Sequence, residues 1–506
     1  MSERKITKVL VANRGEIAVR IIQGLREIGI RTVAVHSVPD RTALHVLIAD
    51  EAYEIGPAPA AESYLVAERL ITTAKKCNAD AIHPGYGFLS ENADFARACD
   101  DAGIVFIGPR PETIDLMGNK LSARHKMIKS GVPVIPGTED AVRDPELAKK
   151  AAAEIGYPVM LKAAAGGGGK GMRVVRSEED IDSALRQTVG EALASFGDDA
   201  VFIERYIENP KHIEVQVLGD GEGHAIHLFE RECSVQRRHQ KVIEESPSPS
   251  LTPELRAEIC EAAVRTAESV NYLGAGTVEF ILSDKGEFFF LEMNTRLQVE
   301  HPITELVTGT DLVRAQIRIA RGQGIPYAQD EIRQHGWSIE FRIYAEDPAK
   351  NFMPAVGRIS SHIAPTGPGV RVDSGIYEGF DVPIYYDPLL AKLIVWGEDR
   401  LQAIARGRRA LMEYTLHGPG HNIAFHLWAL ERPRFIAGTY TTNFIDERFD
   451  PAEFQDPLPD EDREALLTAA ALFENDRRLT IHTGDSPAAA PSPWRLNALR
   501  RMTGGR

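Results

Sequence analysis

Hydrophobic and polar positions alternate with two different periods along the first hundred or so residues. Short apolar runs predict strands, and runs with apolar positions every three to four residues predict amphipathic helices. The expected strands are Lys8–Ala12, Thr32–His36, Ala81–His83 and Ile104–Ile107. The expected helices are Glu16–Ile28 before Gly29, residues 64–76, and a helix capped by Ser90 that runs to about Ala102, before Gly103. This alternation predicts a parallel sheet with helices on both faces.

The rest of the chain divides by composition. At 506 residues we expect about three domains. Residues 134–206 read as a small α+β module with the densest glycine run. Strands dominate the first part of 207–450, with helices at 253–269, capped by Thr252, and at 305–321. The acidic, proline-punctuated residues 450–463 predict a boundary, followed by a helix near 461–475 and a flexible Pro/Ala/Ser-rich stretch at 486–493.

The stretch from Gly274 to His301 is the most informative about chemistry. Two apolar runs flank Ser283-Asp284-Lys285-Gly286, so the segment predicts a β-hairpin. If Leu282 pairs with Glu287, Glu279 faces Phe290, and one face carries Glu279, Glu292 and Asn294. Two carboxylates and an amide oxygen suit Mg²⁺. The alternative is a solvated strand face, since a register slip of one residue would split the set.

Net charge and other bulk properties disfavour several classes of function. The net charge of −15 argues against a general nucleic-acid surface and against binding to acidic membranes. Asn13-Arg14-Gly15 follows the first strand in place of GxGxxG, which argues against a dinucleotide-dependent dehydrogenase. The N-terminus lacks a signal-peptide pattern, and no apolar stretch approaches the ~20 residues that span a bilayer. Four cysteines without CxxC spacing give no zinc or redox signature, so we expect a reduced, cytoplasmic protein.

Residues 158–176 predict a strand–glycine loop–strand arrangement. The P-loop pattern is not met, because Gly171 follows Lys170 where Ser or Thr is required. Consecutive glycines can direct N–H groups at phosphate oxygens, with Lys162 placing an ammonium over them. A flexible glycine linker is the alternative. The following segment 202–207 reads as a strand on which Glu204 could accept a hydrogen bond from an adenine amino group, or could form a surface salt bridge.

The segment 236–241, QRRHQK, concentrates positive charge in an acidic protein. It is either a solvated loop or a pocket for a small oxyanion, with Lys241 as a point charge. Arg296 is placed to hold an anion through its planar fork, and Glu300 is a candidate general base. A lone arginine on a strand, such as Arg342, is most often structural.

Ordered motifs from residue 6 to about 450 resemble those of the biotin carboxylase family of ATP-grasp enzymes. They are VANRGEIAVRI, HPGYGFLSEN, MGNK, AGGGGKGMRVV, ERYIENPKHIEVQVLGD, ERECSVQRRHQKVIEE, GAGTVEF, LEMNTRLQVEHPITE and EFRIYAEDP. The resemblance implies an α/β and α+β multidomain fold. Its parts would be a Rossmann-like N-terminal pre-ATP-grasp domain (1–115), an ATP-grasp domain (116–320) with a mobile lid (134–206), a C-terminal α+β biotin carboxylase domain (335–450), and a tail (451–506), partly helical and partly flexible.

The resemblance also implies roles for residues at matching positions. ATP would contact Lys120, Lys162, Gly168, Gly169, Glu204, Arg205, Tyr206, Ile207, His212, Gln236, His239, Glu279 and Glu292. Two Mg²⁺ or Mn²⁺ ions would be held by Glu279, Glu292 and Asn294, in agreement with the hairpin argument. Bicarbonate would contact Lys241, Arg296, Gln298 and Val299. The catalytic residues would be Arg296, Glu300, Lys241 and Arg342, with Glu300 as the base for bicarbonate and Arg342 next to the biotin ring.

The reaction implied by the resemblance is ATP-dependent carboxylation of biotin through carboxyphosphate. Glu300 would deprotonate bicarbonate while Arg296 and Lys241 hold it in line with the γ-phosphate. The lid would exclude water, which would otherwise hydrolyse the intermediate. The released phosphate would remove the biotin N1′ proton, and Arg342 would stabilise the resulting anion. Residues 450–506 have no A-M-K-M-like turn, so the biotin is expected on a separate carrier protein.

The parent complex is open at this stage. Acetyl-CoA carboxylase, in fatty acid synthesis, is the leading assignment, with a carrier protein and carboxyltransferase subunits as partners and a homodimer as the expected assembly. YYDPLLAKL (385–393) and SPWRLNALRR also resemble subunits of propionyl-CoA, methylcrotonyl-CoA and pyruvate carboxylases. Remote alternatives are an ATP-grasp carboxylate–amine ligase and a non-catalytic regulatory subunit. Departures from commoner family forms, which affect fine tuning, are Lys170, Arg205 and Tyr344.

Overall fold

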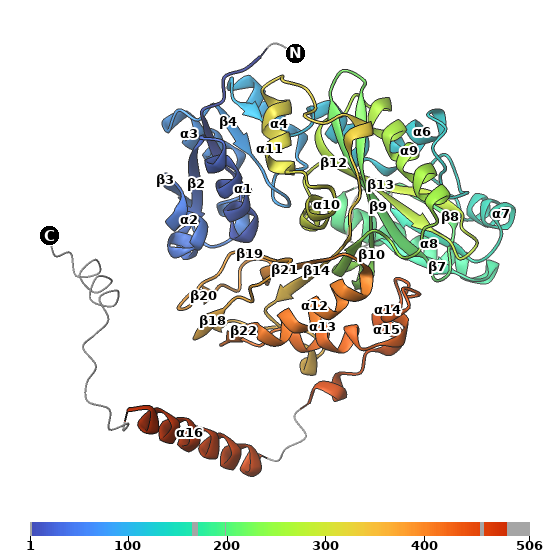
Figure 1. Cartoon of the computed structure of the whole chain (residues 1–506). Helices are drawn as coiled ribbons and strands as arrows, with labels where there is room; N and C mark the ends of the chain where they lie inside the picture. Colours follow the sequence, from blue (N-terminus) through green and yellow to red (C-terminus); the bar gives the residue numbers. More distant parts are fainter. Residues whose placement is uncertain (1–2, 164–170, 198, 456–459, 483–506) are drawn as a thin grey trace. The chain divides into compact units, whose positions relative to one another are not determined.

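The protein forms two compact units, Met1–Pro451 and Ala452–Arg506 (Figure 1). The structure is a computed structural model that describes residues 3–163, 171–197, 199–455 and 460–482. Among these residues, no helix is both long enough and apolar enough to cross a membrane. The borders predicted for the domains inside the first unit stay a prediction.

The N-terminal part is a parallel sheet, as the sequence predicts, in the order β3-β2-β1-β4-β5. The prediction named four of its five strands and missed β3. Its strands are β1 Lys8–Val11, β2 Arg31–Ser37, β3 Glu51–Gly56, β4 Ala81–His83 and β5 Val105–Phe106. The helices of this part are α1 Gly15–Glu27, α2 Leu44–Ile48, α3 Ala67–Lys76, α4 Ala93–Asp101 and α5 Pro111–Gly118. Apolar side chains of α1 and β1 share one buried core with residues of α11, so this sheet is packed against the central region.

The predicted cap of α4 is wrong. Ser90 lies in the preceding turn, where its N–H donates to the Gly87 carbonyl (3.0 Å). The cap is Asn92, whose side-chain oxygen accepts from the Phe95 N–H (2.7 Å). Both residue types are good caps, and the turn at Gly87 decides between them.

A small module of three antiparallel strands lies within residues 134–206, as predicted. The strand order is β7-β6-β8, with β6 Val159–Ala163, β7 Met172–Val175 and β8 Val201–Arg205. Two helices, α7 Pro145–Ile155 and α8 Ile181–Phe196, share its buried core. The predicted strands therefore flank the glycine run on both sides, while residues 164–170 lie outside the described residues. The motion of this module as a lid stays a prediction.

An eight-stranded antiparallel sheet joins the central and C-terminal parts of the first unit. Its order is β13-β12-β9-β10-β11-β14-β21-β19. The strands are β9 Lys211–Asp220, β10 Ala225–Arg237, β11 Gln240–Ser246, β12 Leu273–Leu282, β13 Phe288–Asn294, β14 Trp337–Tyr344, β19 Val370–Ser374 and β21 Leu389–Gly397. Figure 1 shows this continuous ladder from the green central strands to the ochre strands β14 and β21. The sheet thus carries side chains from both parts toward one site.

The remaining elements are short or cover this sheet. They are α6 Lys120–Lys129, α9 Pro253–Ser269, α10 His301–Thr308, α11 Leu312–Ala320, β15 Glu346–Asp347, β16 Met353–Pro354, β17 Gly357–Arg358, β18 Ser361–Ile363, β20 Asp381–Val382, α12 Arg400–Glu413, β22 Thr415–His417, α13 Ile423–Leu430, α14 Pro433–Ile436 and α15 Phe444–Arg448. The predicted α9 is confirmed with its cap, since the Thr252 side chain accepts from the Leu255 N–H (3.3 Å).

The single helix predicted for 305–321 is wrong. The structure has two helices, because Gly309 adopts a left-handed φ of 68° and ends α10. Asp311 then caps α11 by accepting from the Arg314 N–H (2.8 Å). The break allows α10 to begin directly after Glu300, at the edge of the site.

The hairpin β12–β13 forms as predicted, but its pairing at the turn is wrong by one residue. Leu282 lies opposite Phe288 and not Glu287. The reason is a wider turn, in which the Ser283 N–H donates to the Glu287 carbonyl (2.8 Å).

A β-bulge corrects this shift further along the hairpin. Phe290 faces Phe280, whereas the prediction placed it opposite Glu279. The ladder then skips Leu291, so that Glu279 lies opposite Glu292. Because side chains alternate along a strand, Glu279, Glu292 and Asn294 share one face after all.

The second unit contains α16 Asp460–His482, which includes the helix predicted near 461–475 and is longer. The predicted flexible stretch 486–493 lies outside the described residues.

Candidate active site

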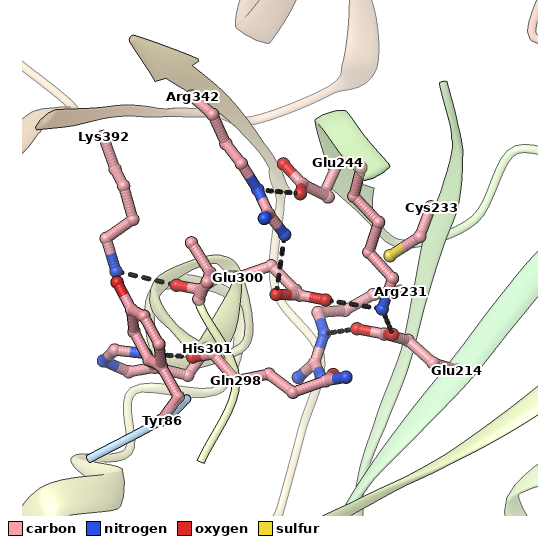
Figure 2. Close-up of polar contacts among 12 residues, drawn as sticks. Tyr86, Glu214, Arg231, Cys233, Glu244, Gln298, Glu300, His301, Arg342 and Lys392 are labelled. Atoms are coloured by element: carbon pink, nitrogen blue, oxygen red, sulfur yellow. Dashed lines mark hydrogen bonds and ion pairs between the residues drawn. The ribbon is translucent and has the colours of Figure 1, made fainter. Parts of the chain in front are cut away.

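The charged residues of the site, predicted and unpredicted, come mainly from neighbouring strands of the eight-stranded sheet. Glu214 of β9 lies opposite Glu279 of β12 on one side and opposite Arg231 of β10 on the other. The segment 295–300 follows β13 and leads into α10 beside them. Figure 2 shows the resulting cluster, in which acidic and basic side chains alternate.

The oxygen-rich face of the β12–β13 hairpin has the donor chemistry of a magnesium site. Asn294 Nδ2 donates to Glu279 Oε1 (2.9 Å), and Glu292 lies directly across the ladder from Glu279. Burial, followed by the charge of Glu279, raises the pKa of Glu292. A divalent cation would relieve this repulsion, and carboxylate and amide oxygens are ligands that Mg²⁺ accepts. The residues present therefore fit such an ion.

Lys241 is the cation at the centre of the cluster. Its Nζ donates to Glu279 Oε1 (2.8 Å), to Glu300 Oε1 (2.7 Å) and to Glu214. Burial opposes its charge, yet the three carboxylates hold the pKa of Lys241 well above its ordinary value. The pKa of Glu279 is held well below its ordinary value by Lys241 and then by His212, against the effect of burial. Lys241 thus ties the hairpin to the segment that follows it.

Arg231 is fully buried and donates hydrogen bonds to several side chains of this cluster. Its Nε donates to Glu214 Oε1 (2.5 Å), and its two Nη atoms donate to Gln216, Thr277, Gln298 and Thr304 at 2.8–3.0 Å. All five N–H donors of the guanidinium can therefore be satisfied. A buried charge with complete partners fixes the side chains around it, so Glu214 and Gln298 are held in place.

Glu300 lies between two cations. Its Oε1 accepts from Lys241 and its Oε2 accepts from Arg342 Nη2 (3.0 Å). Burial alone would raise the pKa of Glu300, but Lys241, Arg342 and Arg231 hold it well below the ordinary value. Glu300 is therefore a carboxylate in this structure, and it gains basicity only when a second anion draws these cations away.

Arg342 reaches Glu244 with its other edge. Figure 2 shows the guanidinium between Glu244 and Glu300, with Nε donating to Glu244 Oε1 (2.5 Å). Glu340 lies directly opposite Glu244 in the β11–β14 ladder, and both are fully buried. Neither oxygen of Glu340 has a hydrogen-bond partner among the described residues. Arg342 is therefore not an isolated structural arginine on a strand.

Arg296 and its neighbours face the other end of the hairpin. Arg296 Nε donates to Glu91 Oε2 (2.8 Å), and its Nη2 donates to Asn294 Oδ1 (2.8 Å). Gln298 Nε2 donates to Glu279 Oε1 (2.9 Å), which brings it into the cluster. Val299 contributes its carbonyl, which accepts from Lys392 Nζ (2.7 Å).

Several residues that were predicted to contact ATP lie close to one another. Lys162 of β6 forms an ion pair with Glu204 of β8, so Glu204 is not in a surface salt bridge but is buried. Burial lowers the pKa of Lys120, which lies near Glu292, Lys162 and Glu204. These side chains bring the small module and the hairpin to one place.

His212 and Gln236 connect this group to the metal-type residues. Gln236 Nε2 lies 3.0 Å from His212 Nδ1, and His212 Nε2 lies 3.1 Å from Glu279 Oε2. Burial opposes the charge of His212, but Glu279 raises its pKa.

Other predicted ATP residues lie apart from these contacts. Arg205 donates to Glu287 (3.4 Å) in the turn of the hairpin, and its guanidinium lies 5.3 Å from the Phe289 ring centre. Tyr206 and Ile207 follow β8 directly. Gly168 and Gly169 lie outside the described residues.

The basic run 236–241 is divided by the hairpin β10–β11. Arg238 and His239 form its turn with positive φ values of 50° and 65°. Arg237 pairs with Glu346 (2.6 Å), whereas Lys241 enters the cluster. The run is therefore not one solvated loop, and its role in anion binding stays a prediction.

A cavity of about 390 Å³ lies beside Arg342. Its lining includes backbone and side chains of α1, the HPGYGF motif and the C-terminal strands: Asn13, Arg14, Glu16, Tyr86, Val299, Arg342, Tyr344, Tyr385 and Tyr386. Aromatic rings and two arginines suit a flat, weakly polar ring with a carbonyl group.

Sequence reasoning missed five residues that build this site. They are Glu91, Glu214, Arg231, Glu244 and Tyr86. All five stand in motifs quoted above, Glu244 as the last residue but one of ERECSVQRRHQKVIEE. Glu214, Arg231 and Glu244 alternate along strands, and Tyr86 and Glu91 lie in the loop between β4 and α4. Neither pattern distinguishes a buried polar side chain from an exposed one.

Comparisons with known proteins agree with this arrangement. Three family models match: "Biotin carboxylase, N-terminal domain" at residues 5–114, "Carbamoyl-phosphate synthase L chain, ATP binding domain" at 119–328, and "Biotin carboxylase C-terminal domain" at 340–447.

Similar proteins are found among curated and solved ones. A biotin carboxylase of Nostoc sp. is 53% identical over 443 residues, covering 88% of this chain and 99% of the relative. The mitochondrial methylcrotonoyl-CoA carboxylase subunit alpha of Dictyostelium discoideum is 48% identical over 496 residues, covering 98% of this chain and 71% of the relative. The biotin carboxylase domain dimer of Hydrogenobacter thermophilus 2-oxoglutarate carboxylase, solved with MgADP, ADP and bicarbonate, matches with a TM-score of 0.85 and 48% identity, covering 90% of this chain and all of that one.

The fold, the cluster at Lys241 and these matches over nearly nine-tenths of the sequence lead to one conclusion. The chain belongs to the biotin carboxylase family and is an ATP-dependent ligase with an ATP-grasp domain.

Proposed function

We propose that this chain carboxylates biotin on a separate carrier protein, with ATP and bicarbonate, in the first half-reaction of acetyl-CoA carboxylase. The observation that carries the proposal is the placement of Glu300 between Lys241 and Arg342, together with the cavity that Arg342 lines. One end of the cluster can hold a small oxyanion and the other a biotin ring. The products would be carboxylated biotin, ADP and phosphate.

ATP is proposed to lie between the small module and the hairpin. Lys162 and Lys120 would neutralise its phosphates, and the N–H groups of the glycine run would add to this. Glu204, which pairs with Lys162, would turn to the adenine amino group. Two Mg²⁺ ions, or Mn²⁺ in their place, would be held by Glu279, Glu292 and Asn294 and would neutralise the phosphate oxygens. The matched Hydrogenobacter structure, solved with MgADP, supports this arrangement.

Bicarbonate is proposed to displace carboxylates from the cations around it. Lys241 contacts three carboxylates, so it can release one of them and still be neutralised. Arg296 would turn from Glu91 to the anion, with Gln298 and Val299 completing its contacts. When Lys241 and Arg342 interact with the bound anion, the pKa of Glu300 rises from its low value. Glu300 can then accept the bicarbonate proton.

Attack of bicarbonate on the γ-phosphate would give carboxyphosphate, with Lys241 and Arg296 holding the reactants in line. Closure of residues 134–206 over the site would exclude water. In the cavity, Arg342 would stabilise the negative charge that develops on the ring carbonyl of biotin after the released phosphate removes the N1′ proton.

We further propose a homodimer in the cytoplasm that works with a biotin carboxyl carrier protein and carboxyltransferase subunits. The matched Hydrogenobacter domain is described as a dimer, which supports the first part.

The test is ATP cleavage by the purified chain with free biotin. We expect cleavage to depend on bicarbonate, to rise with biotin, and to stop when EDTA removes Mg²⁺. Cleavage that needs neither bicarbonate nor biotin, but needs an amine and a carboxylate, would identify another ATP-grasp ligase. Absence of cleavage under all conditions would favour a regulatory subunit.

A second candidate is the same half-reaction in a methylcrotonyl-CoA-type carboxylase. The match to the Dictyostelium subunit extends over 98% of this chain, beyond the 88% covered by the Nostoc protein. Propionyl-CoA and pyruvate carboxylases remain alternatives of the same kind. Purification of the native complex, followed by carboxylation assays with acetyl-CoA, larger acyl-CoA esters and 2-oxoacids, decides between them.

A further inference from the structure

Lys392 of β21 is a fully buried cation in a costly position. It lies directly opposite Arg342 in the β14–β21 ladder, and its exposed fraction is 0%. Like charges that face each other across a ladder destabilise it, and a buried charge adds a desolvation penalty. The contacts of Lys392 therefore need to offset a substantial cost.

These contacts join three parts of the first unit. Lys392 Nζ donates to the Val299 carbonyl (2.7 Å), lies 3.4 Å from Glu16 Oε2 of α1, and lies 3.7 Å from Asp373 Oδ2 of β19. Val299 belongs to the segment before α10. One ammonium group thus holds the N-terminal helix, the C-terminal strands and the segment that carries the proposed bicarbonate ligands.

Glu16 extends this connection to the wall of the cavity. The Tyr86 hydroxyl donates to Glu16 Oε1, and both residues line the cavity together with Val299 and Arg342. A series of contacts, Tyr86–Glu16–Lys392–Val299, therefore connects the cavity lining to the residue next to Glu300. Lys392 is the one member of this series that does not line the cavity.

The position of the Val299 carbonyl determines the backbone position of Glu300. Because a peptide unit is planar, fixing this carbonyl also fixes the amide nitrogen and Cα of Glu300. Lys241 and Arg342 then set the Glu300 side chain. Without the Lys392 contact, the segment 296–300 would keep its side-chain contacts and the contact of the Gln298 carbonyl with His301 Nδ1 (2.7 Å), but would lose the anchor at the Val299 carbonyl.

We propose that Lys392 is a positioning residue: by holding the Val299 carbonyl and pairing with Glu16, it keeps the segment 296–300 aligned with the cavity wall at Tyr86. The inference rests on the proposed function, since that segment is there assigned to bicarbonate. Lys392 touches no substrate and acts through Val299.

The experiment compares variants by steady-state ATP cleavage with free biotin. Lys392→Met removes the donor and leaves the buried Glu16 without its cation, which can unfold the protein, whereas Asp373 keeps its pair with Arg371 (2.8 Å). The double variant Lys392→Met/Glu16→Gln removes one positive and one negative charge together, and keeps an acceptor for Tyr86. Arg400→Met is the matched control, because it removes another cation of the C-terminal region, half-buried and paired with Glu245 at 2.7 Å, whose other hydrogen bonds go to the carbonyls of Phe435 and Ile436.

We expect the double variant to raise the KM for bicarbonate about tenfold, the loss of one hydrogen bond from a charged group, with the KM for ATP unchanged. Glu16→Gln alone keeps the donor to Val299 and should raise the KM for bicarbonate only about twofold to threefold. Arg400→Met should lower the Tm without changing the ratio of the two KM values. A second readout is the rise in Tm on adding bicarbonate to the MgADP-bound protein, which the double variant should lose.

Three results would overturn the proposal. They are an unchanged KM for bicarbonate in the folded double variant, an equal rise of both KM values, or an equal effect of Glu16→Gln alone. Failure of the proposed function looks different: the wild-type chain itself would then show no bicarbonate-dependent ATP cleavage, and the assignment of Lys392 would fall with it.

Discussion

The two sides of Arg342 present buried carboxyl groups in opposite states. On one side, Glu300 accepts from two cations, and its pKa lies well below the ordinary value. On the other side, Glu244 shares Arg342 with it and faces Glu340 across the ladder. Burial raises the pKa of Glu244 to about 7 and that of Glu340 well above its ordinary value.

The difference shows that partners, and not depth alone, decide the charge of a buried acid. All three groups are within 1% of complete burial. Glu300 has a full positive charge at each oxygen, whereas the Glu244–Glu340 pair shares one guanidinium edge. Near neutral pH the pair therefore keeps a proton, and the net charge around Arg342 stays balanced. Glu300 is the member of the set that is ready to exchange its cations for a substrate anion.

The largest effect is expected from Glu300→Gln. The amide cannot accept the bicarbonate proton, and Lys241 and Arg342 lose their shared counter-charge. We expect the rate of bicarbonate-dependent ATP cleavage with free biotin to fall by at least about 100-fold, the contribution of a general base. The increase of Tm on nucleotide binding should remain, because Lys162 and Lys120 are untouched. A near-normal rate would contradict the assigned role of Glu300.

A smaller, pH-dependent effect is expected from Glu340→Gln. A carboxyl group whose pKa is higher in the folded chain binds more protons when folded. The contribution of such a group to the free energy of unfolding is therefore fully present below about pH 4.5. It is lost as the pH rises through the folded pKa, which is about 7 for Glu244. The variant mimics the protonated Glu340, removes the like charge from Glu244 and should abolish this loss.

The measurement is urea unfolding of both proteins at pH 5 and pH 8. The variant should match the wild type at pH 5 and exceed its free energy of unfolding at pH 8 by about 1–3 kcal/mol, since one pKa unit corresponds to ~1.4 kcal/mol. Because other groups titrate alike in both proteins, the difference isolates the pair. A variant that is less stable than the wild type at pH 8 would show that Glu340 is ionised and paired in solution.

The sequence correctly predicts which residues share the oxygen-rich face of the hairpin, although the predicted register is wrong by one residue at the turn. Alternation along β13 keeps Glu292 and Asn294 together in any register, and the bulge at Leu291 returns Glu279 to their side. The break at Gly309 carried a usable signal, since glycine often ends a helix, but the apolar period ran across it.

The charge network could not be predicted in the same way. Arg231 meets Gln298 and Thr304, which lie 67 and 73 residues away along the chain. Lys392 meets Glu16 only because β21 joins the same sheet as the central strands. Such partners follow from sheet order, and periodicity within one segment contains no information about it. The family resemblance supplied Arg342 and Lys241 with two of their carboxylates, Glu279 and Glu300, but not Glu214 and Glu244.

The smallest effect is expected on the cavity side of Arg342, from Tyr344→Phe. The Tyr344 hydroxyl lies beside the Arg342 guanidinium, and the ring lines the cavity. Removal of the hydroxyl leaves the ring and the Glu244 and Glu300 contacts of Arg342 in place. We expect the KM for free biotin to rise about twofold to fivefold, in keeping with one modest hydrogen bond, and the KM for bicarbonate to stay constant. If the bicarbonate KM rises in step, the two sides of Arg342 do not act independently, and the contrast between Glu300 and the Glu244–Glu340 pair loses its functional meaning.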